Sequence, residues 1–199
     1  MPDLHNGYID VPAGKIASIV TSLEMRRKPA NIANEPPPSP VQLEKALHPD
    51  PAWYRDLYRR IGEDWLWFSR LQLNDQELSQ IIGDPKVDIF SLQSQGRDEG
   101  LLELDFRKSG ECELSFFGLT KNYIGKGIGR WMMRQAVDLA WQKPIKRFWV
   151  HTCTLDAPGT LQFYVKSGFT PIRRQIEIAD DPRVTGKIPR SAAAQIPFL

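Results

Sequence analysis

The stretch YIGKGIGRWMM, residues 123–133, places three glycines at alternate positions directly before a helical pattern. Glycine loses more backbone entropy on folding than any other residue, so this cluster indicates a tight turn or a close approach to another group. It is not a P-loop, because Lys126 is followed by Gly127 and position 120 is Thr. It is one residue too short for the dinucleotide fingerprint G-x-G-x-x-G. We therefore expect a strand, a glycine loop and a helix whose N-terminus either binds phosphate or only follows a tight turn.

The composition of the 199-residue chain points to one globular domain of ordinary size with an extra segment. The hydrophobic fraction of 41% is enough for a core, and the net charge of +2 gives no reason to expect nucleic acid or an anionic membrane as a partner. No apolar run approaches the ~18 residues of a membrane span. The N-terminus, MPDLHNGYID, lacks the layout of a signal peptide. These features predict a cytoplasmic protein.

The cysteines and histidines argue against a metal site. Cys112 and Cys153 form no C-x-x-C pair, and we expect both to be buried, reduced thiols. His5, His48 and His151 lie far apart without the spacing of metal ligands. We therefore expect no metal cofactor.

A proline-rich run, EPPPSP at 35–40, is predicted to be an extended connector. It divides the chain into an accessory N-terminal arm, residues 1–40, and a main domain, residues 41–199. The β-branched stretch at 16–25 predicts a strand in the arm. We expect this strand to extend the edge of the sheet or to pair with a second subunit, and the sequence leaves both a monomer and a homodimer open.

After the connector, the patterns predict a strand, two helices, a three-strand meander, a helix, a strand, a short helix, a strand and a polar tail. Asp50 before Pro51 is a predicted helix N-cap, and Asn74 with Glu77 has the spacing of a capping box. The predicted strands span residues 41–47, 87–93, 100–107, 112–120, 147–153 and 170–179, and the predicted helices span residues 51–61, 75–82, 127–142 and 157–167. This order predicts an α/β (α+β) domain.

Two motifs in this order resemble the GNAT superfamily of acyl-CoA-dependent N-acyltransferases, over roughly residues 41–179. Gly127 and Gly129 fill the last two fixed places of the family's motif (Gln or Arg)-x-x-Gly-x-(Gly or Ala), and Arg130 follows them. Ile124 departs from it where the family prefers Gln or Arg. The stretch LQFYVKSGF, residues 161–169, is similar to the family's aromatic-Tyr-x-x-x-Gly-Phe. The resemblance implies a mixed, mostly antiparallel central sheet flanked by helices and splayed at the acetyl-CoA site.

The resemblance also implies acetyl-CoA as a co-substrate. The backbone of the glycine loop would hold its diphosphate, and the end of strand 112–120 would offer backbone groups to the pantetheine arm and polarise the thioester carbonyl. The alternative is a plain turn and an ordinary buried strand end. The cofactor-binding residues that the resemblance implies are Phe117, Gly118, Leu119, Ile124, Gly125, Lys126, Gly127, Ile128, Gly129 and Arg130.

Amine attack on a thioester needs a proton donor for the leaving thiolate and a base for the ammonium. Tyr164 matches the family's tyrosine near the sulfur and is the candidate acid. Glu113 and Glu103, on neighbouring predicted strands, are the candidate bases. We interpret His151 as a hydrogen-bonded core residue rather than a base, and Asp156 as the N-cap of the helix at 157–167.

The function predicted from these residues is an acetyl-CoA-dependent N-acetyltransferase that moves an acetyl group to a primary amine by direct attack on the thioester. The acceptor is a small-molecule amine or a protein or peptide amine. A non-catalytic coenzyme A-binding sensor or interaction module is the alternative, and another acyl donor or an O-linked acceptor also stays open. Four aromatic residues either wall an acceptor pocket or pack in the core: Trp53, Trp65, Trp67 and Phe68.

Overall fold

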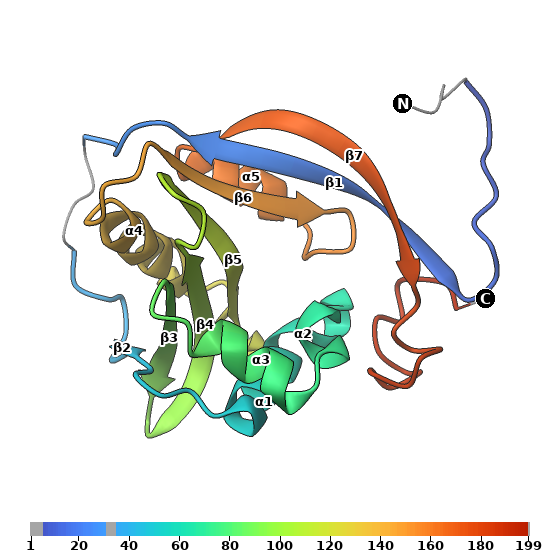
Figure 1. The fold of residues 1–199 in the computed structure, drawn as a ribbon, viewed down its shortest axis with the longest axis horizontal. Helices are drawn as coiled ribbons and strands as arrows, with labels where there is room; N and C mark the ends of the chain where they lie inside the picture. Colours follow the sequence, from blue (N-terminus) through green and yellow to red (C-terminus); the bar gives the residue numbers. More distant parts are fainter. Residues whose placement is uncertain (1–5, 31–34, 199) are drawn as a thin grey trace.

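A computed structural model of the chain describes residues 6–30 and 35–198. Its centre is a seven-stranded sheet in the order β2-β3-β4-β5-β6-β1-β7 (Figure 1). β5 and β6 pair in parallel, and the other neighbours pair antiparallel. This confirms the predicted mixed, mostly antiparallel sheet. The strands are β1 Lys15–Met25, β2 Gln42–Lys45, β3 Val87–Ser94, β4 Arg97–Asp105, β5 Glu111–Leu119, β6 Arg147–Cys153 and β7 Thr170–Asp180.

Helices cover both faces of the sheet. The helices are α1 Pro51–Gly62, α2 Ser69–Gln72, α3 Asp75–Ile82, α4 Ile128–Ala140 and α5 Thr160–Lys166. On one face, α1 to α3 pack over alternate strand residues such as Ile89 and Leu101. On the other face, α4 and α5 pack over Leu102, Leu104 and Phe148. Because successive side chains of a strand point to opposite faces, both faces of the central strands are buried.

The helix starts follow the predicted capping signals with one exception. The Asp50 carboxylate accepts from the backbone N–H groups of Ala52 and Trp53 at 2.8 and 3.1 Å, and α1 begins at Pro51. Asn74 and Glu77 form the predicted capping box. The predicted N-cap role of Asp156 is wrong, because α5 begins at Thr160 and its cap is Gly159, at φ +87°.

β1 lies inside the sheet, so the expectation that it extends the edge is wrong. It pairs with both β6 and β7: Thr21, for example, lies opposite Thr152 on one side and Arg174 on the other. The proline-rich connector only requires extended backbone, so it carries no information on where the preceding strand pairs. We propose that β1 belongs to the same structural domain as residues 41–199.

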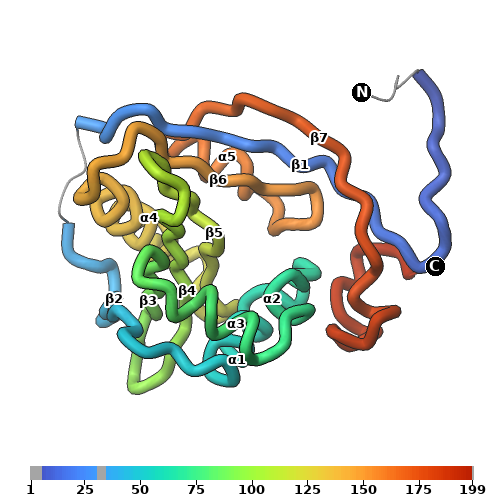
Figure 2. Tube along the Cα trace, in the orientation of Figure 1, coloured from blue at the N-terminus to red at the C-terminus, as the bar shows by residue number. Residues whose placement is uncertain are grey.

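The C-terminal segment, residues 181–198, folds back onto the body rather than forming the expected polar tail (Figure 2). Arg183 is buried and pairs with Asp181, with Nη2 2.8 Å from Oδ2. Its guanidinium also donates to the carbonyl of Ile196 at 2.9 Å. The apolar side chains Ile188, Ala192 and Ala193 join the core under α1. Because its one buried cation is fully partnered, a polar sequence can pack here.

The helices and the two cysteines bear on two further expectations from the sequence. Among residues 6–30 and 35–198, no helix is long and apolar enough to cross a bilayer. Both cysteines are free thiols, and Cys112 is buried as expected, but Cys153 is only half-buried because it lies at the end of β6. Burial raises the pKa of the Cys112 thiol, so this residue is a small core side chain rather than a nucleophile.

The place of β1 leads to a test by truncation. Deleting residues 1–27 removes the common partner of β6 and β7, so we expect this variant to lose its cooperative thermal unfolding transition. Deleting residues 1–13, which precede β1, should leave the melting temperature within a few degrees, since residues 6–13 are exposed. Thermal denaturation followed by circular dichroism measures both. A cooperative transition in the longer deletion would contradict the structural role of β1.

Candidate active site

The sheet opens between β5 and β6. The two strands pair from Glu111–Arg147 to Glu113–Trp149 and then part. On its other edge, β5 has an irregularity: Leu114 pairs with Leu104 and Phe116 with Glu103, which leaves Ser115 as an extra residue. Such a bulge bends a strand and increases its twist. Alternate residues of a strand direct their N–H and C=O groups to opposite edges, so the end of β5 presents unpaired backbone groups to the gap.

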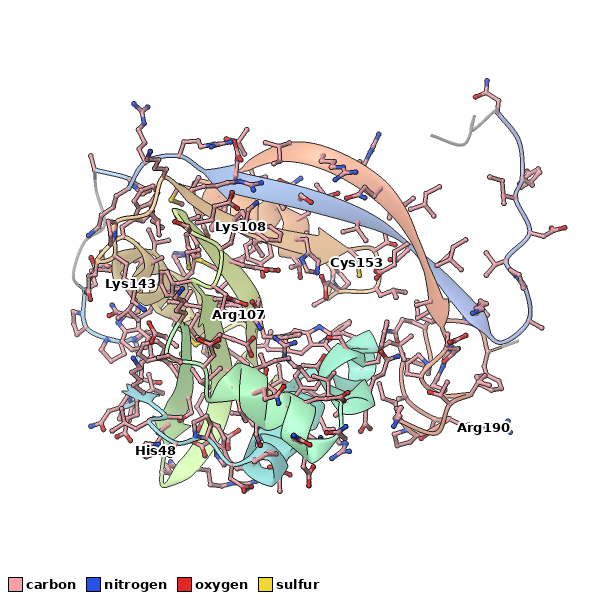
Figure 3. The ribbon with its side chains drawn as sticks, in the orientation of Figure 1. His48, Arg107, Lys108, Lys143, Cys153 and Arg190 are labelled. Atoms are coloured by element: carbon pink, nitrogen blue, oxygen red, sulfur yellow. The ribbon has the colours of Figure 1, made fainter. Side chains whose placement is uncertain are left out.

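A cavity of about 560 Å³ occupies this gap. Its walls come from the segment joining α1 to α2, the end of β5, the glycine loop, the end of β6 and the start of α5. Cys153, at the end of β6, marks the place in Figure 3. Segments far apart in the sequence therefore meet at one opening of the sheet.

The glycine loop supplies backbone donors to this cavity. Gly125 and Gly127 adopt φ +80° and +79°, a left-handed conformation that favours glycine, and Gly127 is the N-cap of α4. Among the described residues, no hydrogen-bond acceptor is found for the successive backbone N–H groups from Gly125 to Arg130. These donors and the positive end of the α4 dipole form a site suited to an anion.

Gly129 shows that the loop leaves room for a ligand. A Cβ atom at this position would meet only Leu119 Cδ1, at the ordinary contact distance of 3.7 Å, so the packing of the chain itself does not require glycine. Glycine within a helix costs about 1 kcal/mol relative to alanine. At Gly118, by contrast, a Cβ would approach Ile61 Cγ2 to 2.4 Å, so packing alone requires that glycine.

The structure brings most of the implied cofactor-binding residues together. Lys126 and Ile128 are not among the residues that line the cavity: Ile128 is fully buried, and Lys126 Nζ lies 5.5 Å from the ring centroid of Tyr123. The members of the set that line the cavity are Phe117, Gly118, Leu119, Ile124, Gly125, Gly127, Gly129 and Arg130.

Tyr164, on α5, also lines the cavity. Its ring packs edge-on against Phe163 and Phe169, with centroid distances of 5.6 and 5.9 Å. No hydrogen bond of its hydroxyl group is found within the described residues. Burial, together with the negative charge of Asp156, raises the pKa of Tyr164 well above its usual value. The hydroxyl group thus stays protonated at neutral pH and is able to donate.

The two candidate bases lie in different surroundings. Glu103 is fully buried, accepts from Tyr54 and Arg70, and is not among the residues that line the cavity. Arg70 Nη2 lies 2.5 Å from its Oε1, so the carboxylate joins α1 and α2 to β4. Glu113 is half-buried on β5, and its side chain contacts His151 but is not among those that line the cavity. Of the two predicted bases, Glu103 therefore lies in a buried network outside the cavity, and Glu113 lies next to a residue that lines the cavity.

His151 lies in surroundings that the sequence did not predict. It lines the cavity, its side chain is 50% exposed, and its Nδ1 lies 3.6 Å from Glu113 Oε1. The interaction with Glu113 raises the pKa of His151. The interpretation as a core residue is wrong, and alternation along β6 could have shown it. Because Phe148 and Val150 are buried on one face, His151 points to the other, toward the gap.

Asp156 ties the two sides of the cavity together. Its Oδ2 accepts from Thr152 Oγ1 at 2.6 Å and from the backbone N–H of Cys153 at 3.0 Å. Its Oδ1 accepts from Trp67 Nε1 at 3.3 Å. The loop after β6 is thereby connected to the segment between α1 and α2, which fixes the width of the opening at that end.

Aromatic rings form the wall of the cavity near the contact between Asp156 and Trp67. Trp67 packs with Tyr58 and Phe116 at centroid distances of 5.4 and 5.3 Å, and Trp65 and Phe68 complete the wall. Trp53 lies elsewhere, with its Nε1 2.8 Å from Asp98 Oδ2. Three of the four aromatic residues singled out in the sequence are therefore at the site.

Comparison with solved structures shows the same fold in other proteins. A functionally unknown conserved protein from Staphylococcus epidermidis matches with a TM-score of 0.62 at 9% identity, covering 84% of this chain and 63% of that one. A GCN5-related N-acetyltransferase from Sphaerobacter thermophilus has a TM-score of 0.56 at 12% identity, covering 85% and 53%. A GNAT family acetyltransferase from Elizabethkingia anophelis with acetyl-CoA bound has 0.52 at 16%, covering 67% and 78%. The chain thus spans only about half to two thirds of the first two proteins.

Sequence comparison identifies the family. No curated protein matches the chain. The model of the acetyltransferase (GNAT) family matches residues 52–169, which is more than half of the chain and includes α1, the glycine loop and Tyr164. The chain therefore belongs to the acetyltransferase (GNAT) family.

Proposed function

We propose that the protein is an acetyl-CoA-dependent N-acetyltransferase that acetylates a primary amine by direct attack on the thioester. The observation that carries the proposal is that one cavity collects unpaired backbone N–H groups, a protonated tyrosine hydroxyl and a histidine paired with a carboxylate. These are the groups that binding a diphosphate, stabilising a leaving sulfur and deprotonating an amine require. Membership of the family supports the same reaction.

The fit to acetyl-CoA follows from the backbone. The N–H groups from Gly125 to Arg130 would hold the diphosphate, and the open space above Gly129 would admit it. The unpaired end of β5, from Phe116 to Leu119, would accept the pantetheine arm as an added strand. A backbone N–H there would stabilise the charge that develops on the thioester oxygen. The Elizabethkingia protein of the same fold, which has acetyl-CoA bound, supports this assignment.

We assign the base to His151, with Glu113 as its positioning residue. The amine nitrogen attacks the carbonyl carbon while the carbon–sulfur bond breaks, and the proton lost from nitrogen passes to the imidazole. Glu113 holds the ring and stabilises the imidazolium that forms. Glu103 then has a structural role, because both of its oxygens already accept from Tyr54 and Arg70.

Tyr164 would act on the leaving group. A hydroxyl with a raised pKa is a poor donor of a full proton to a thiolate, but it donates a hydrogen bond to the charge that develops on sulfur. We therefore propose that coenzyme A leaves as a thiolate held by Tyr164 and takes its proton from solvent as it departs.

The aromatic end of the cavity suggests the kind of acceptor. Trp67 and Phe116 line this end and pack against the buried ring of Tyr58, so the site suits a small primary amine carried on an apolar or aromatic body. A polyamine or a peptide would extend past this wall.

The direct test measures thiol release from acetyl-CoA with three acceptors: an arylalkylamine, a polyamine and a peptide. The wild type is compared with Tyr164→Phe in the same assay. We expect turnover to be highest with the arylalkylamine. In the variant, kcat should fall by ~10²-fold because the leaving sulfur loses its donor. Acetyl-CoA affinity should stay within about threefold, since the backbone binds the diphosphate. Binding of acetyl-CoA without thiol release from any amine would favour the sensor alternative and overturn the proposal.

The Glu113–His151 pair predicts a specific change in the pH profile. His151 accepts a proton only when neutral, so kcat/KM should rise with pH through its raised pKa. Glu113→Gln removes the carboxylate that raises this pKa, so the acidic limb should move to lower pH and the maximal rate should fall. Glu111→Gln is the matched control, because it removes a carboxylate from the same strand that pairs with Arg147 instead.

Both profiles are measured with one amine, so that the titration of the amine itself contributes equally to each. An acidic limb that stays at the same pH in Glu113→Gln would remove this pair from the mechanism.

A further inference from the structure

β7 forms one outer edge of the sheet and is almost wholly exposed. It pairs with β1 along one edge, and its other edge is the edge of the sheet (Figure 1). The side chains of Ile172, Ile176 and Ile178 are 47%, 49% and 54% exposed. Within the described part of the chain no strand pairs with this edge, and an edge of this length with exposed apolar side chains is a template for another strand. The strand at the opposite edge, β2, is much shorter.

We propose that β7 pairs antiparallel with β7 of a second copy of the chain, about a two-fold axis at Gln175, to form one continuous sheet. A C2 dimer of this kind uses the same strand twice, so its sequence must be complementary to itself. The stretch IRRQIEI, residues 172–178, meets this condition.

The register follows from the face that each side chain occupies. Residues directly opposite in an antiparallel pair point to the same face, so the two-fold axis must pass through a residue and not between two. With the axis at Gln175, Arg173 lies opposite the partner's Glu177, and the same contact recurs by symmetry. Arg174 then lies beside the partner's Ile176 and covers it with its aliphatic part.

Other positions of the axis lose this complementarity. An axis at Arg174 places that residue opposite the partner's Arg174, and an axis at Glu177 places two carboxylates together. An axis at Ile176 leaves Arg173 opposite the partner's Ala179 without a charged partner. The register at Gln175 also places Ile178 opposite the partner's Ile172, which is the residue at which the pairing of β7 with β1 shifts its register.

The dimer would bring a second chain to the border of the active-site cavity. Glu177 lines that cavity, and its Oε2 lies 3.5 Å from Ser18 Oγ, leaving the carboxylate open to a cation. Pairing would set the partner's Arg173 against this carboxylate. The carboxylate of Glu177 on the cavity wall would then be paired with a cation of the second chain.

Charge reversal tests the pairing directly. Sedimentation equilibrium of the full-length chain should show a dimer for the wild type. Arg173→Glu and Glu177→Arg should each raise the dimer dissociation constant by at least about tenfold, because each places two like-charge pairs across the axis. The double variant, with both changes in one chain, should restore the dimer. Lys86→Glu, an exposed residue before β3, is the control for the change in net charge and should remain dimeric.

A cross-link gives an independent measurement. Gln175→Cys places two thiols opposite each other at the axis, within the range of a disulfide, so mild oxidation should yield a covalent dimer. Lys86→Cys should not. A wild type that is monomeric at all concentrations, or a dimer that neither responds to charge reversal nor cross-links at position 175, would overturn the proposal.

Discussion

The parting of β5 from β6 is the constraint on which the rest of this structure depends. A buried strand edge normally pairs each of its N–H and C=O groups, and these two strands stop pairing after Glu113 and Trp149. The extra residue Ser115 bends β5 away from its neighbour, while β6 continues to pair with β1 along its other edge. The unpaired edge that results is exposed to the cavity and is available to a ligand that can act as a strand.

Polar contacts on either side hold this opening in place. Asp156 links the end of β6 to Trp67, and Glu103 links Arg70 and Tyr54 beneath Phe116. Both carboxylates accept hydrogen bonds from several donors, so each holds neighbouring segments together and is not free to react. His151 and Tyr164, to which we assign the chemistry in our proposal, both line the cavity. In this proposal, the residues that hold the site in place differ from those that take part in the reaction.

The features that the sequence predicted are those set by local chemistry. The capping box at Asn74, the glycine loop before α4 and the span of β6 depend on a few neighbouring residues, and each is found as expected. The features that it missed depend on contacts between distant segments. Nothing within residues 15–25 shows that β1 separates β6 from β7, and nothing near Arg183 shows that it will be buried. His151 was missed for a different reason, since the face it occupies was readable but a lone histidine on a strand is usually structural.

The central claim is that the backbone of the glycine loop binds the diphosphate of acetyl-CoA, and Gly129→Glu tests it most directly. A carboxylate in the first turn suits the dipole of α4, so the fold should be retained, while the side chain fills the space and repels the phosphates. Calorimetric titration should show acetyl-CoA affinity reduced by at least about tenfold, as expected when charge-assisted hydrogen bonds are lost. Gln142→Glu, just beyond the C-terminal end of α4, should bind like the wild type. Unchanged affinity in a folded Gly129→Glu variant would contradict the account.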